Sequence, residues 1–119
     1  MRVFSVLLCV IAAAACNKAT TETEAAATRT VIVEEAAFVP NNVVVRQGGI
    51  VRFTFQGTAH SVIFTEQPGR PENIEPPVAN TTEERVFLAE GTYSYTCAEH
   101  RSTMNGTVTV ERFTPAGGP

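Results

Sequence analysis

Short segments in which apolar and polar residues alternate, separated by turn-forming residues, make up most of this chain after residue 29. The alternation is clearest in residues 51–55 and 106–111. A period of two is typical of strands that bury one face. The segments are rich in Val, Thr, Phe and Tyr, which favour strands, and the region shows no helical period. The pattern therefore predicts an all-β domain.

Turn-forming glycine, proline and asparagine residues divide this region into its expected strands. These strands are residues 30–34, 43–46, 51–55, 61–64, 85–88, 92–96 and 106–111. Residues 66–82 contain four prolines, which cannot donate to a β-ladder, so this segment is expected to be a long surface connection and not a central strand. Short strands with such turns predict a Greek-key antiparallel β-sandwich of about seven to eight strands.

The N-terminus has the features of an export signal. Arg2 precedes an apolar run over residues 3–15, which is too short to span a bilayer as a helix, and a run of alanines then meets Cys16. This arrangement resembles a bacterial lipoprotein signal, in which the cysteine carries the lipid, although Ala13 stands where that signal usually has leucine. Ordinary cleavage among the alanines, leaving a soluble protein, is the alternative.

These features divide the chain into four parts. We expect a signal peptide of the lipoprotein type at residues 1–15, a flexible tether at 16–28, one folded domain at 29–112 and a disordered tail at 113–119. The expected location is therefore periplasmic or otherwise outside the cytoplasm, with a lipid at Cys16 holding the protein to a bacterial membrane.

The charge of the chain is modest. It has 9 Lys and Arg against 12 acidic residues, all of them glutamate, for a formal net charge of −3. Because no basic patch can be recognised, nucleic-acid binding is not expected.

Soft metal-binding side chains are few and concentrated. Cys97, His100 and Met104 lie within eight residues, and His60 is the only other histidine. His60 and Cys97 both stand at ends of expected strands, and a sandwich can bring two such ends to one pole. A thiolate, two imidazoles and a weak thioether suit a blue-copper centre. Structural zinc sites usually have four firm Cys or His ligands, and this segment with His60 offers three, so zinc is the weaker alternative.

With these residues in view, the chain resembles the cupredoxins, the blue-copper family of plastocyanin, amicyanin and pseudoazurin. The resemblance runs from about residue 31 to residue 110. Its motifs are Phe38-x-Pro40 with Val43-x-Val45-x-x-Gly48, then Val51-x-Phe53, His60-Ser61-Val62-Ile63-Phe64, Gly91-x-Tyr93-x-Tyr95-x-Cys97-x-x-His100 and Met104-x-Gly106-x-Val108-x-Val110.

The resemblance implies a copper-binding domain at 29–112 with one type-1 copper. It implies His60, Cys97 and His100 as equatorial ligands and Met104 as the axial one. Three residues separate His100 from Met104, where plastocyanin-like loops have four and amicyanin-like loops two. Ser61 stands where the family often has asparagine, which helps to tie the ligand segments together, so that brace should be weaker or different. Glu99 stands where the family often has proline.

The expected function is that of an electron carrier, a monomer that passes single electrons between redox protein partners, with His100 as the electron port. Copper storage or delivery through the same ligands is the alternative. A self-contained copper enzyme is not expected, because two histidines cannot also supply a second copper centre. A metal-free adhesion domain would leave the concentration of Cys, His and Met unexplained. Tyr93 and Tyr95 are expected to pack in the core, as are Phe38, Phe53, Phe55, Phe64 and Phe87.

Overall fold

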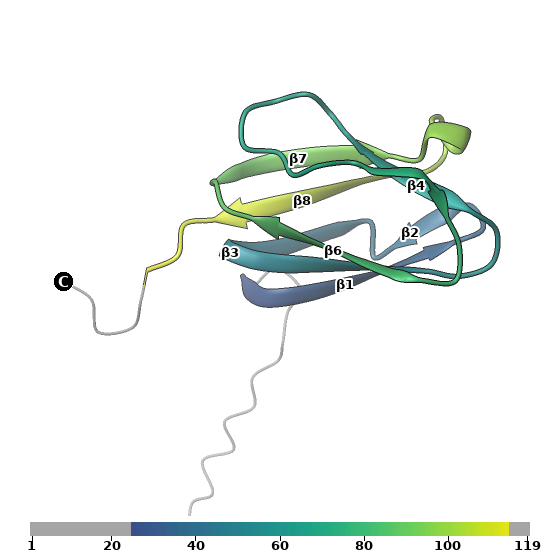
Figure 1. Ribbon diagram of the computed structural model, residues 1–119. Coiled ribbons are helices and arrows are strands. Elements are labelled where there is room, and N and C mark those ends of the chain that lie inside the picture. The colour runs from purple at the N-terminus through teal and green to yellow at the C-terminus, as the bar shows by residue number, and fades with distance from the viewer. Residues whose placement is uncertain (1–24, 115–119) are drawn as a thin grey trace, which may run out of the picture.

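The computed structural model describes residues 25–114, which are built almost wholly from strands (Figure 1). The elements are β1 (Ala26–Glu34), β2 (Ala37–Val39), β3 (Asn42–Phe55), β4 (His60–Phe64), β5 (Ile74–Val78), β6 (Thr82–Phe87), β7 (Gly91–Thr96), the short 3₁₀ helix η1 (Ala98–His100) and β8 (Asn105–Glu111). The expected signal peptide, Cys16 with most of the expected tether, and the last residues of the expected tail lie outside the described residues.

The predicted all-β fold is confirmed, and its strands form two facing layers that meet through β3 (Figure 1). The strand order is β2-β1-β3-β8-β7-β4-β5, and β6 also pairs with β3. The first part of β3 pairs with β8 and the part from Gly49 onward pairs with β6. Between them Gly48 has a positive φ of 81°, which glycine adopts without strain. The segments 43–46 and 51–55, expected as two strands, are therefore one strand that serves both layers.

Three further features differ from the sequence prediction. The chain reverses direction between β1 and the short β2 and again between β2 and β3, so β3 runs parallel to β1. β3 also runs parallel to β8, and the sandwich is therefore not wholly antiparallel. The connection at 66–82 contains β5, whose prolines are tolerated because it is an edge strand paired with β4. β1 begins at Ala26, inside the range expected for the tether, because residues 26–28 already pair with β3.

The core lies between the layers and is rich in aromatic rings. All five phenylalanines expected there, and Tyr93 and Tyr95, are at most 3 % exposed. The Tyr95 ring meets Phe38, Phe53 and Phe64 edge-on at centroid separations of 4.8, 5.5 and 5.8 Å. Such pairs contribute roughly 0.5–1.5 kcal/mol each beyond the area they bury. They hold the end of β7, and hence Cys97, in a fixed position.

Tyr95 also gives a pH-dependent prediction. Its buried hydroxyl has no hydrogen-bond partner among the described residues, and burial raises its pKa. The folded chain keeps this proton above about pH 10, where the unfolded chain loses it, so stability falls by about 1.4 kcal/mol per pH unit as the pH rises further. We expect Tyr95→Phe to be at least as stable as the parent at neutral pH and more stable above about pH 10.

Denaturant unfolding across this pH range measures the effect. Tyr93→Phe is the control, because the Tyr93 hydroxyl donates a 2.8 Å hydrogen bond to the carbonyl of Ala89 and its loss should destabilise the protein at neutral pH. A Tyr95→Phe protein that loses as much stability as this control would contradict the prediction.

Candidate metal centre

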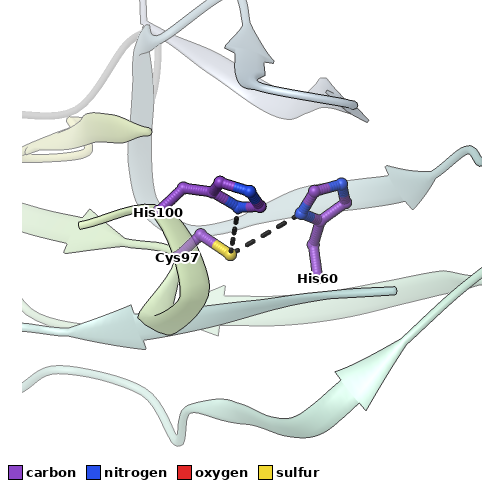
Figure 2. A group of neighbouring side chains, drawn as sticks. All are labelled: His60, Cys97 and His100. Atoms are coloured by element: carbon purple, nitrogen blue, oxygen red, sulfur yellow. Dashed lines mark hydrogen bonds between the residues drawn. The ribbon is translucent and has the colours of Figure 1, made fainter. Parts of the chain in front are cut away.

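Three side chains with metal-binding atoms meet at one end of the sandwich (Figure 2). His60 begins β4, Cys97 directly follows β7, and His100 ends η1. β4 and β7 are neighbouring antiparallel strands, so the start of one lies beside the end of the other. The metal-binding atoms of His60, Cys97 and His100 all lie within 4.8 Å of one another. The sequence prediction had named these three residues, and the fold brings them together.

A compact hydrogen-bonded turn shapes the loop that carries two of these side chains. The Cys97 carbonyl accepts from the His100 N–H at 3.1 Å, and the His100 carbonyl accepts from the Met104 N–H at 2.8 Å. The Cys97 N–H donates back to the Met104 carbonyl at 3.2 Å. Residues three and four apart in such turns lie on one side. The three residues between His100 and Met104 thus form one turn, and this turn places the Met104 backbone beside that of Cys97.

The four predicted ligands differ in exposure. His60, Cys97 and Met104 are 0 % exposed, whereas His100 is partly exposed. Ala98, Glu99 and residues 101–103 around it are exposed. His100 is therefore the ligand candidate nearest to solvent.

Ser61 ties the two ligand segments together. Its buried hydroxyl accepts a 3.0 Å hydrogen bond from the Ala98 N–H and donates to Glu99 Oε2 at 3.2 Å. These contacts join β4 to the loop that follows Cys97. We expected the contact that asparagine makes in the family to be weaker or different in this protein. The hydroxyl of Ser61 makes a contact of this kind instead.

Glu99 is the acidic group closest to the site. The Cys97 thiol donates a hydrogen bond to Glu99 Oε2 at 3.0 Å. This bond, with smaller contributions from hydrogen bonds donated by the Glu99 backbone N–H and by Ser61, holds the pKa of the Glu99 carboxyl below its ordinary value against the opposing effect of burial. A metal that displaced the thiol proton would leave a carboxylate beside the thiolate.

The separations suit a metal bound between the three atoms. His60 Nδ1 lies 3.6 Å from Cys97 Sγ, and His100 Nδ1 lies 3.9 Å from it (Figure 2). Metal–sulfur bonds of about 2.3 Å and metal–nitrogen bonds of about 2.0 Å in a trigonal plane leave sulfur and nitrogen about 3.7 Å apart. The donor set of one thiol and two imidazoles is that of a blue-copper centre. The side chains present therefore fit copper.

Two residues near the site were not recognised in the sequence. Thr58 Oγ1 lies 3.3 Å from His60 Nε2 and donates to Glu35 Oε1 at 3.2 Å. Thr58 stands two positions before His60, which was the one local signal available. Glu35 is 23 residues from Thr58, so sequence spacing does not indicate their contact.

Comparison with known proteins gives a family and a group of similar structures. The family model described as a cupredoxin-like domain matches residues 5–110. A reduced Cu(I) form of an amicyanin variant is 23% identical, with a TM-score of 0.62 over 75% of this chain and 87% of that one. Oxidised plastocyanin from Dryopteris crassirhizoma is 25% identical, with a TM-score of 0.62 over 70% of this chain and 100% of that one.

A copper-containing nitrite reductase from Thermus scotoductus is also similar, at 23% identity and a TM-score of 0.57. The match covers 72% of this chain but only 22% of the reductase. No curated protein matches the sequence.

Proposed function

This chain belongs to the cupredoxin-like domain family, and we propose that it carries single electrons between redox protein partners through one type-1 copper. The observation that carries the proposal is the convergence of His60, Cys97 and His100 at separations suited to a trigonal metal. Bound copper would supply a Cu(I)/Cu(II) couple. The likeness to amicyanin and plastocyanin supports the same function.

The surroundings of the ligands favour electron transfer. His60 and Cys97 are buried, and Ser61 ties their segments together, so their positions should change little between the two oxidation states. We infer that Met104 is the axial ligand, because the turn from His100 brings its backbone to Cys97 and its side chain is buried. We infer that electrons pass through His100, which is partly exposed among exposed loop residues.

Reconstitution with copper tests this function. The Cu(II) protein should show an intense visible thiolate-to-copper band, a small parallel hyperfine splitting in its electron paramagnetic resonance spectrum, and a reversible one-electron couple. Met104→Ala should change the hyperfine splitting while the visible band persists. A colourless Cu(II) protein with a large splitting would refute the proposal.

Glu99 should lower the reduction potential of this centre. A carboxylate near the thiolate stabilises Cu(II) over Cu(I), by about 1–2 kcal/mol for a charge a few ångströms away at a protein surface. Glu99→Gln should therefore raise the potential by roughly 40–90 mV, since 59 mV corresponds to a tenfold change for one electron. The new amide can also donate to the thiolate, which acts in the same direction.

Voltammetry of the copper protein measures this shift. Glu111→Gln is the matched control, because Glu111 ends β8 whereas the metal centre adjoins the start of that strand. It should leave the potential almost unchanged. Equal shifts of the reduction potential in both variants would show that the potential depends only on net charge, and would contradict a specific effect of Glu99.

We also propose that the protein is exported and held to a membrane through a lipid on Cys16. The apolar run and the alanines before Cys16 support this proposal. Within residues 25–114 no helix is long and apolar enough to cross a membrane. Expression in a bacterium with labelled palmitate should label the parent protein and leave Cys16→Ser unlabelled. Label in neither protein, with a soluble product cleaved among the alanines, would contradict anchoring.

A further inference from the structure

Three polar groups, Glu35, Thr58 and His60, form a hydrogen-bonded series that leads from the protein surface to a buried imidazole. Glu35 lies in the turn after β1, and Thr58 lies in the loop between β3 and β4. The Thr58 hydroxyl is 3.2 Å from Glu35 Oε1 and 3.3 Å from His60 Nε2. His60 itself is 0 % exposed, whereas Thr58 and Glu35 are exposed. One hydroxyl thus links an exposed carboxylate to a fully buried imidazole.

The protons available to Glu35, Thr58 and His60 determine which group donates and which accepts in each hydrogen bond. An ionised carboxylate can only accept hydrogen bonds, so the single proton of the Thr58 hydroxyl points at Glu35. The hydroxyl oxygen must then accept from His60, which requires a proton on Nε2. A neutral imidazole with its proton on Nε2 has its lone pair on Nδ1. Nδ1 is the nitrogen that lies 3.6 Å from Cys97 Sγ.

We propose that Glu35 and Thr58 are positioning residues that select the Nε2–H tautomer of His60 and so keep Nδ1 ready to bind the metal. The inference deepens the proposed function and rests on it for the identity of the metal. Hydrogen bonds from metal-binding histidines to nearby acceptors commonly fix the tautomer and ring orientation, and their loss typically reduces metal affinity by about 10–100-fold. Here a hydroxyl provides this contact and a carboxylate 23 residues away orients it.

Variants of both residues separate this role from a purely structural one. Thr58→Val keeps the shape of the side chain but removes the hydroxyl, and Thr58→Ser keeps the hydroxyl. Glu35→Gln can turn its amide towards Thr58 as a donor, which frees the hydroxyl proton to point at Nε2. Glu34→Gln is the matched control, because Glu34 is a neighbouring exposed glutamate with the same charge.

The first measurement is the ¹⁵N chemical shifts of the His60 ring in the metal-free full chain, at a mildly alkaline pH where an ordinary imidazole is neutral. The parent, Thr58→Ser and Glu34→Gln should show a proton on Nε2. Thr58→Val and Glu35→Gln should show a mixture of tautomers. A parent with its proton on Nδ1, or an unchanged Nε2–H tautomer in both Thr58→Val and Glu35→Gln, would overturn the proposal.

The second measurement is Cu(I) affinity by competition with a chelator of known strength. Thr58→Val should bind at least about tenfold more weakly than the parent, and Thr58→Ser should restore most of the loss. Equal affinities for the parent and Thr58→Val would overturn the proposal. Because the tautomers are read without metal, the expected tautomers in a protein without a type-1 spectrum would refute the proposed function and leave the positioning role intact.

Discussion

Replacing Cys97 with serine should abolish the visible band of the copper-loaded protein. It should also weaken copper binding by more than about 10–100-fold, which is the typical loss when only a hydrogen-bond partner of a metal ligand is removed. The band arises from charge transfer between a thiolate and Cu(II), and a serine hydroxyl stays protonated at neutral pH. The exchange should leave the fold intact, because serine is similar in size and can still donate to Glu99, as the Cys97 thiol does at 3.0 Å.

Absorption spectra and chelator competition on both proteins check this result. Thr96→Ser is a suitable control, because it alters the neighbouring residue while keeping a hydroxyl that can donate to the Met104 carbonyl, as Thr96 does at 2.9 Å. It should retain the band. A Cys97→Ser protein that stays intensely coloured would place the copper thiolate at Cys9 or Cys16, the other cysteines of the chain, and would contradict the assigned site.

The convergence of His60, Cys97 and His100 could be predicted from the sequence for a simple physical reason. Few side chains in the chain bind soft metals, and after the first residues almost all of them lie in one loop, with His60 as the remaining candidate. Period-two alternation predicted the strands that position them, because each strand buries one face. Residues whose role depends on contacts between distant segments could not be predicted in this way. Glu35 is the clearest example, because its contact with Thr58 exists only after β1 and β3 have paired.

The errors in the predicted fold have the same origin. Gly48-Gly49 was interpreted as the end of a strand, but β3 continues through it because β8 pairs before this point and β6 after it. Pro76 and Pro77 argued against a central strand, and they occupy an edge strand instead. The parallel pairing of β3 with β1 and β8 could not be predicted, because apolar and polar residues alternate in the same way in parallel and antiparallel strands. Local pattern therefore indicated where strands lie, and tertiary pairing decided how they join.

Loading the protein with Cu(I) should raise its melting temperature by more than about 15 °C, and removing the metal should reverse the change. A ligand that binds only the folded chain at a thousand times its dissociation constant adds about 4 kcal/mol of stability. In a domain of this size each kcal/mol shifts the melting temperature by roughly 4–8 °C. The ligands come from β4 and from the loop between β7 and β8, so a metal that joins them cross-links segments that unfolding would separate.

Calorimetry of the metal-free and loaded proteins under anaerobic conditions measures this shift, and loading should raise the melting temperature of His100→Ala much less. The same measurement bears on the choice between electron transfer and copper delivery. A carrier must keep its copper through many oxidation cycles, so the large shift should persist after exposure to a mild chelator. A delivery protein must release its cargo, so a small shift, lost on exposure to the same chelator, would favour delivery. The buried positions of His60 and Cys97 lead us to expect retention, because a chelator reaches these two side chains less readily than the partly exposed His100.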